Sequence, residues 1–251
     1  MIAGLRTACG VLRSLRIYYG DRARHAAMDR LYARFVRPGD LVFDAGAHVG
    51  DRVAAFRRLG ARVVAIEPQP ALVTTLRLMY GRDSAVTIEP VALGREPGAV
   101  TLNLNLDNPT VSTASAAFIR AADGAPGWQG QAWTRTVEVP MTTLDELVAR
   151  HGVPAFAKID VEGFEAETLQ GLTQTLPALS FEFTTIQRDV AAECIARCRA
   201  LGAGRFNAAL GESQTFVYPG WVGAATIERW LAGLPMEANS GDIYARLGEG
   251  D

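Results

Sequence analysis

The sequence predicts an α/β fold, with a mostly parallel sheet and helices on both of its faces. From Leu41 onward, short apolar stretches alternate with stretches of helical periodicity. Three of the short stretches end at or next to an acidic residue, at Asp44, Glu67 and Asp160. In parallel sheets the ligand crevice lies beyond the carboxyl ends of the strands. We therefore expect these three carboxylates to meet at one site.

Composition limits the classes of protein that fit. A chain of 251 residues can build one large domain with a full core, and its formal net charge of −2 offers no basic surface for nucleic acid. Because no apolar run is long enough to span a bilayer, we expect no stable membrane insertion. Three cysteines do not make a disulfide framework, and the scattered histidines do not complete a zinc site. We expect free thiols and a cytoplasmic location, whereas the oligomeric state stays open.

We expect an N-terminal helical segment over residues 1–36 and the main domain over residues 37–251. In the first twenty or so residues, arginines alternate with apolar residues at helical spacing, which predicts an amphipathic basic helix. Such a helix can touch a membrane surface or pack on its own domain, and the second alternative is the more common.

The first half of the main domain reads as alternating strands and helices. Gly60 and Gly81 are placed to end helices, and Pro68 and Pro70 to begin one. We expect strands at 41–45, 62–66, 85–92 and 100–106, and helices at 49–59 and 68–80.

Residues 107–134 break this rhythm with a long stretch that contains Asp-Asn-Pro at 107–109, Ser and Thr at 112–115, and Gly and Pro at 124–130. Long insertions in a compact domain are usually functional or mobile, so we expect an irregular lid over a substrate. Four of its side chains are candidates to line the substrate site: Ser112, Thr113, Ser115 and Trp128.

The second half returns to alternation. Thr143 and Glu146 form a capping-box pattern that opens a helix. We expect strands at 135–140, 155–160, 179–184 and 242–247, weaker strands at 206–210 and 215–218, and helices at 143–151, 165–172, 189–201 and 224–231.

The loop from Asp44 to Gly50 indicates which ligand the crevice binds. A strand, a glycine loop, a helix and a second strand ending in an acid form a nucleotide-binding half-unit, in which the acid accepts the ribose hydroxyls. Dinucleotide sites have a glycine where this chain has Asp44, because a carboxylate there would repel a pyrophosphate. S-adenosylmethionine carries a ribose, an ammonium and a sulfonium but no phosphate, so the loop predicts a methyl-donor site. The alternative is an ordinary β–α turn that needs glycine for packing.

At this point the chain resembles FkbM-type S-adenosylmethionine-dependent methyltransferases. The resemblance covers about residues 37–184 and is most specific in the octet Lys158-Ile-Asp-Val-Glu-Gly-Phe-Glu165. It implies a class I (Rossmann-like) methyltransferase fold, with a seven-stranded sheet whose last strand is antiparallel. It also implies methyl transfer to a hydroxyl oxygen of a sugar, glycan, polyketide or other secondary metabolite. His48 departs from the family pattern, where asparagine is expected.

From the loop and the resemblance we assign the cofactor contacts. Gly46 and Gly50 allow close approach of the backbone, Asp44 faces the ammonium, and Glu67 takes the ribose hydroxyls. The full set of expected cofactor-binding residues is Asp44, Gly46, Ala47, His48, Gly50, Glu67, Pro68, Val91, Ala92 and Asp160.

For catalysis, a hydroxyl acceptor needs a base or a group that stabilises the developing alkoxide. Asp160 and Glu162 are candidates for the base, and Lys158, the single lysine of the chain, for a cation that lowers the acceptor's pKa. Glu182, on the next strand, would orient Lys158 or the acceptor. Alternatively, Lys158 and Glu182 form a structural ion pair, and Glu162 caps the following helix. His48 is a further possible base.

Other functions stay open at this stage. Asp160, Glu162 and Glu182 could hold Mg²⁺, although we assign no resident metal. The fold could also serve as a non-catalytic S-adenosylmethionine-binding scaffold. An NAD-linked enzyme is disfavoured by Asp44, and an RNA 2′-O-methyltransferase by the acidic chain.

Overall fold

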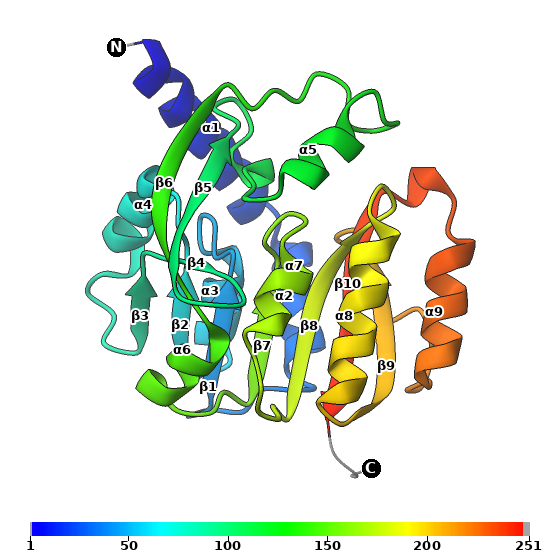
Figure 1. Ribbon diagram of the computed structural model, residues 1–251. Coiled ribbons are helices and arrows are strands. Elements are labelled where there is room, and N and C mark those ends of the chain that lie inside the picture. The colour runs from blue at the N-terminus through cyan, green and yellow to red at the C-terminus, as the bar shows by residue number, and fades with distance from the viewer. Residues whose placement is uncertain (1, 248–251) are drawn as a thin grey trace.

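The computed structural model of the protein describes residues 2–247. Its main sheet has seven strands in the order β3-β2-β1-β7-β8-β10-β9 (Figure 1). The first five of these are parallel, and β10 runs antiparallel to both neighbours. The bounds are β3 Val86–Glu89, β2 Arg62–Ile66, β1 Leu41–Ala45, β7 Phe156–Ile159, β8 Ala178–Thr184, β10 Ser240–Leu247 and β9 Ala203–Leu210. This is the seven-stranded sheet with an antiparallel last strand that the sequence resemblance implied.

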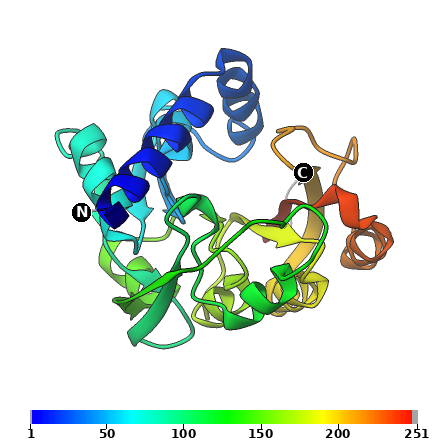
Figure 2. The ribbon, with the colours of Figure 1, turned by 90° about the horizontal axis from the view of Figure 1, so that it is seen from above.

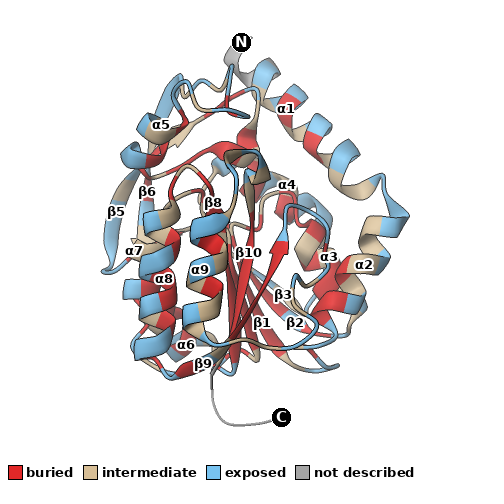
Figure 3. Cartoon of the chain, turned by 90° about the vertical axis from the view of Figure 1, so that its right-hand side faces the viewer, coloured by how far each residue is buried: buried red, intermediate tan, exposed pale blue. Residues whose placement is uncertain are grey.

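Helices cover both faces of the sheet, as predicted. Successive residues of a strand point to opposite faces, so each strand packs against both layers of helices. On β1, Val42 packs in the core beneath α2, α3 and α4, whereas Phe43 packs in the core beneath α6, α7, α8 and α9. Figure 3 shows the buried sheet between these two layers. The bounds are α2 Arg22–Tyr32, α3 Asp51–Arg58, α4 Pro70–Tyr80, α6 Leu144–His151, α7 Glu165–Gln170, α8 Arg188–Ala200 and α9 Ala224–Gly233.

A second, three-stranded sheet of order β4-β6-β5 rises above the main one. Its strands are β4 Ala92–Leu93, β5 Gly98–Leu104 and β6 Arg135–Thr142. The strand expected at 85–92 is therefore divided, since β3 ends at Glu89 and β4 pairs with β6 instead.

The insertion at 107–134 is more regular than expected. It contains the 3₁₀ helix η1 (Pro109–Val111) and the helix α5 (Ala116–Ala122), which Ser115 caps by accepting a hydrogen bond from the backbone of Phe118. Seen from above, the insertion and α1 (Ile2–Tyr19) lie over the same end of the main sheet (Figure 2).

The weak strand expected at 215–218 does not form. The side chain of Asn207 donates to the carbonyls of Tyr218 and Gly220, and Asn207 Oδ1 accepts from the Tyr218 amide. Side-chain bonds thus replace the regular backbone ladder that a strand needs, although Val217 still donates one backbone hydrogen bond to Ala208.

The basic N-terminal helix α1 packs on the rest of the chain, against α4 and η1. Gly10 touches the ring of Pro109, and Arg6 forms an ion pair with Asp107. No helix within the described residues is both long and apolar enough to cross a membrane. The three cysteines carry free thiols, as expected.

Candidate active site

A cavity with an empty volume of about 890 Å³ lies at the carboxyl ends of β1, β2 and β7. Its wall also includes the insertion and the end of α1, through Thr110 and Tyr18. Most of the residues expected from the sequence to bind cofactor or substrate, or to catalyse the reaction, line this one cavity: Asp44, Gly46, His48, Glu67, Pro68, Val91, Ala92, Ser112, Lys158, Asp160 and Glu162.

The two glycines of the first loop serve different contacts. Gly46 has φ +82°, and a Cβ there would come within 1.7 Å of the Asp160 carbonyl oxygen, so only glycine lets β1 and β7 meet at the cavity floor. At Gly50, which has φ +83°, an added Cβ would instead clash with the ring of Tyr80. Gly50 does not line the cavity. Ala47 is buried in the core beneath α2 and α3.

Asp44 is 2% exposed, and its Oδ2 atom has no hydrogen-bond partner among the described residues. Burial, followed by the charge of Asp51, raises the pKa of Asp44 to about 7. A buried carboxylate with a free oxygen at a cavity wall is stabilised by a cation. It therefore fits the cationic amino-acid part of S-adenosylmethionine.

Glu67 is held in place by the backbone of the glycine loop. Its Oε2 accepts from the His48 amide at 2.9 Å, and its Oε1 accepts from the Gln69 amide at 2.8 Å. Burial nevertheless raises the pKa of Glu67 to about 8. Each carboxylate oxygen retains a second lone pair, so Glu67 has the capacity to accept ribose hydroxyls.

His48 adopts a left-handed backbone with φ +49°, and its Nε2 lies 3.4 Å from Thr110 Oγ1. Its ring meets that of Tyr18 edge-on, at 5.3 Å between centroids. Burial lowers the pKa of His48 to about 4. The imidazole is therefore neutral at physiological pH and a weak base, which favours hydrogen bonding over proton abstraction.

Lys158 is 1% exposed and donates to Asp160 at 3.0 Å and to Asp242 at 2.8 Å. No ion pair joins it to Glu182 among the described residues, so the alternative of a Lys158–Glu182 ion pair is wrong. Asp242 was not expected in the site from the sequence. Because β10 is antiparallel, its start lies at the edge where the parallel strands end, and Asp242 stands opposite Glu182 in register.

Three carboxylates, on Asp160, Glu162 and Glu182, lie with ligand oxygens within 4.8 Å of one another. Burial and the nearby Asp160 charge raise the pKa values of Glu162 and Glu182 well above normal. Burial opposes ionisation of Asp160, but the charges of Lys158 and Arg52 lower its pKa overall. Asp160 is thus the ionised carboxylate of the three, and Glu162 and Glu182 are the two that hold a proton more readily. Hard oxygen ligands at this spacing could also hold a divalent cation.

The loop that carries Glu162 is fixed by two neighbours. Glu165 accepts from the amides of Val161 and Gly163, which fixes the loop before α7. No side chain among the described residues caps α7, so the alternative in which Glu162 caps this helix is wrong. Thr113 Oγ1 donates to the Glu162 carbonyl at 2.6 Å. These bonds hold Glu162 at φ +56° against the cavity.

Of the four residues expected to line a substrate site, only Ser112 lines the cavity. Thr113 and Ser115 hydrogen-bond within the insertion, and Trp128 packs edge-on against Phe118 at 5.0 Å. These three hold the insertion together, and Thr110 supplies a second hydroxyl to the cavity wall.

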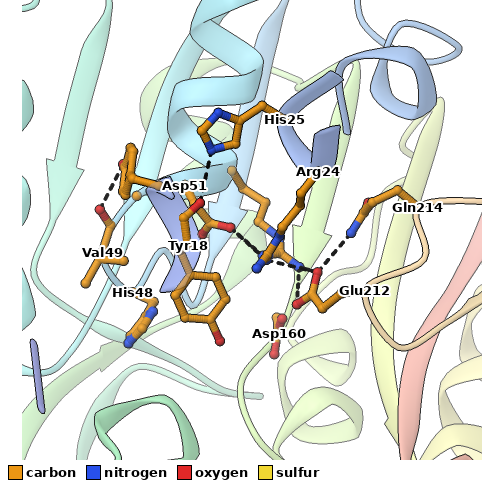
Figure 4. Close-up of polar contacts among 12 residues, drawn as sticks. Tyr18, Arg24, His25, His48, Val49, Asp51, Asp160, Glu212 and Gln214 are labelled. Atoms are coloured by element: carbon orange, nitrogen blue, oxygen red, sulfur yellow. Dashed lines mark hydrogen bonds and ion pairs between the residues drawn. The ribbon is translucent and has the colours of Figure 1, made fainter. Parts of the chain in front are cut away.

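The cavity wall also contains Tyr18, Arg52 and Glu212, which were not predicted from the sequence as site residues. Figure 4 shows Glu212 below Arg24 and close to Asp160, with Tyr18 to their left. Arg52 directly follows Asp51, the acidic first residue of α3, and this charge pair is the only local sequence feature that could have pointed to Arg52. Tyr18 and Glu212 are far in sequence from the other residues that line the cavity, and no local sequence pattern marks them.

This strand order is that of the Rossmann-like, class I methyltransferase fold. The family model described as "Methyltransferase FkbM domain" matches residues 44–218, and the chain belongs to that family. No curated protein matches the chain significantly.

Among solved structures, a precorrin-6y C5,15-methyltransferase from Geobacter metallireducens is 12% identical, with 89% of this chain and 87% of that chain covered and a TM-score of 0.43. A TehB-like SAM-dependent methyltransferase from Corynebacterium glutamicum is 10% identical, with 88% of each chain covered and a TM-score of 0.44. A 1,6-didemethyltoxoflavin-N1-methyltransferase from Burkholderia thailandensis, with bound S-adenosylhomocysteine, is 14% identical, with 98% and 88% covered and a TM-score of 0.41.

Proposed function

We propose that the protein transfers a methyl group from S-adenosylmethionine to a hydroxyl oxygen of a small acceptor, such as a sugar, a glycan or a secondary metabolite. The observation that carries this proposal is Glu162, a carboxylate with a raised pKa that lines the cavity beside the cofactor loop. A neutral hydroxyl has to lose its proton during methylation, so its methylation needs such a group.

The residues of this chain fit the cofactor. Asp44 offers a buried unpaired oxygen, and Gly46 leaves the cavity floor free of a side chain. When bound, S-adenosylmethionine supplies a methyl group on a cationic sulfur. Asp44 faces its ammonium, and Glu67 accepts from its ribose.

The carboxylate cluster handles the acceptor. Asp160, fixed by Lys158, would accept a hydrogen bond from a second donor of the acceptor and so orient the reacting hydroxyl toward Glu162. Glu162 would take the proton of the reacting hydroxyl as its oxygen lone pair forms the bond to the methyl carbon, and the electrons of the broken sulfur–carbon bond would leave with S-adenosylhomocysteine. Alignment within the cavity supplies the rest of the rate enhancement.

A metal-assisted variant of this chemistry has one observation in its favour, the spacing of Asp160, Glu162 and Glu182. A divalent ion there would bind two neighbouring hydroxyls of a sugar and acidify one of them. Full activity after extensive chelation would exclude this variant, and restoration by Mg²⁺ alone would support it.

The proposal is tested by incubating the protein with methyl-deuterated S-adenosylmethionine and a panel of hydroxylated metabolites. We expect a deuterated methoxy product by mass spectrometry and NMR, with release of S-adenosylhomocysteine. A Glu67→Ala variant should lose cofactor binding in calorimetry. Labelled methyl on nitrogen or carbon would overturn hydroxyl methylation, and a wild type that binds S-adenosylmethionine but transfers nothing to any acceptor class would favour the scaffold.

A further inference from the structure

Two arginines, Arg24 on α2 and Arg52 on α3, share the same two carboxylates, Asp51 and Glu212. Arg52 and both carboxylates line the cavity, and Arg24 lies behind them. Arg24 lies 3.1 Å from Asp51 and 3.0 Å from Glu212. Arg52 lies 2.6 Å from Asp51 and 3.0 Å from Glu212. Both guanidinium side chains are nearly buried, at 11% and 12% exposure. Figure 4 shows Arg24 between Asp51 and Glu212, with Gln214 on the far side of Glu212.

The two carboxylates are not held equally. Asp51 is 4% exposed and belongs to α3 itself, whereas Glu212 is 48% exposed on the loop that follows β9. An ion pair with so exposed a partner contributes about 0–1 kcal/mol. Glu212 is therefore the anion that another ligand can displace at little cost.

The arginines also have hydrogen-bonding capacity to spare. The Nε atoms of both Arg24 and Arg52 are buried without a partner among the described residues. A guanidinium binds a carboxylate best through two parallel N–H donors. Once Glu212 leaves, the Nη groups of Arg24 and Arg52 that it holds become free to bind a ligand carboxylate.

The rest of the cavity wall, among the described residues, offers no other arginine and no unpaired lysine to a ligand carboxylate. Asp44, Glu67, Asp160 and Glu162 make the floor acidic. Among the cavity-lining residues that the structure describes, Arg52 and Lys158 are the only lysine or arginine side chains, and Lys158 is already paired with Asp160 and Asp242.

We propose that Arg52, together with Arg24, binds the α-carboxylate of the methyl donor, and that Glu212 occupies this position while the cofactor is absent. The ammonium on the same carbon then faces Asp44, so one acidic and one basic group of the wall match the two charges of an amino acid. Cofactor binding displaces Glu212 and releases its loop, residues 211–217. This inference rests on the proposed function only in taking S-adenosylmethionine as the donor.

The test compares two probes by calorimetry: S-adenosylhomocysteine, which carries the amino-acid group, and 5′-methylthioadenosine, which has the same nucleoside without it. Glu212→Gln removes the competing anion, so we expect S-adenosylhomocysteine to bind about five- to tenfold more tightly, with binding of 5′-methylthioadenosine unchanged. Glu237→Gln, the same change at an exposed position of the chain, should leave both affinities at the wild-type value.

For Arg24→Gln we expect the converse result. The affinity for S-adenosylhomocysteine should fall about tenfold, and the affinity for 5′-methylthioadenosine should stay at the wild-type value. Thermal melting confirms that each variant is folded. Weaker binding of S-adenosylhomocysteine by Glu212→Gln would overturn the inference, because Glu212 would then hold the ammonium. Equal effects on both probes would also overturn it. If the wild type bound neither probe, the proposed function would fail as well, whereas tight wild-type binding with a silent Glu212→Gln would remove this inference alone.

Discussion

At the scale of single residues, Lys158 sets the charge of the site. It is the only lysine of the chain and is buried between Asp160 and Asp242. Its ammonium keeps Asp160 ionised although Asp160 lies close to Glu162 and Glu182. Burial, and then proximity to that fixed negative charge, raises the pKa values of the two glutamates, so the three neighbouring carboxylates take different protonation states.

This division of roles predicts the effect of Glu162→Gln. We expect kcat to fall by about 10²- to 10⁴-fold, the usual contribution of general-base catalysis, because an amide cannot take the hydroxyl proton. The affinity for S-adenosylhomocysteine should stay close to that of the wild type. Since the base acts only when ionised and its pKa is raised, kcat/KM of the wild type should continue to increase with pH above the range in which an ordinary glutamate titrates.

Glu165→Gln is the matched control. It changes a neighbouring buried carboxylate but keeps an amide oxygen that can accept from the Val161 and Gly163 amides. We expect this variant to keep most of its kcat. A Glu162→Gln enzyme as fast as the wild type would assign the proton to another group, with Asp160, Glu182 or a bound metal as the candidates.

At the scale of elements, the strands of the main sheet were predictable because each is marked by local periodicity. β1 and β2 have the predicted bounds. The helix α5 was missed because its seven residues lie within a Gly- and Pro-rich stretch. Strand 215–218 was predicted wrongly, since an alternating pattern does not reveal that Asn207 bonds that backbone with its side chain.

The site was predictable only where it is carried by strand ends. Asp44, Glu67 and Asp160 follow from their positions after apolar strands, and all three line the cavity. Asp242 depends on the antiparallel placement of β10, and Glu212 on the path of a loop. Neither long-range arrangement has a local signal in the sequence.

The N-terminal helix provides a prediction at this scale. A Cβ on Gly10 would lie 2.9 Å from Pro109 Cδ, so Gly10→Val forces α1 away from the insertion, at a cost of about 1–3 kcal/mol. Because α1 carries Tyr18 to the cavity wall, we expect the affinity for S-adenosylhomocysteine to fall, together with faster proteolysis of α1. Ala8→Val, at an exposed position of the same helix, is the control and should change neither. Unaltered affinity in Gly10→Val would show that α1 is not needed for binding.

At the scale of the whole molecule, the fold brings distant segments to one end of the sheet. α1, the glycine loop, the insertion, the octet after β7 and the loop after β9 all contribute to the cavity wall. The result is a protein that buries several carboxylates around a space suited to a cationic ligand. The buried carboxylates that bind the ligand therefore destabilise the folded protein while that ligand is absent.

This destabilisation predicts how stability depends on pH. Burial raises the pKa of Asp44 from 3.8 to about 7 and that of Glu67 from 4.5 to about 8. A carboxylate whose pKa is raised by folding stabilises the protein fully below its unfolded pKa, and this contribution is lost as pH rises through the folded value. We therefore expect the melting temperature of the cofactor-free protein to fall between about pH 5 and pH 8.

Bound S-adenosylmethionine should reverse this loss, because its positive charges favour ionised Asp44 and return the pKa toward its normal range. The melting-temperature difference between cofactor-bound and cofactor-free protein should thus increase from pH 6 to pH 8 at a saturating cofactor concentration. Asp44→Asn separates the causes, since it removes one titrating group. The variant should be more stable than the wild type without cofactor at pH 8, by about 1–3 kcal/mol, and should show little further stabilisation on adding cofactor. A difference that is constant with pH in the wild type would mean that Asp44 does not face the bound cation, and the assignment of the donor's ammonium to this residue would have to be abandoned.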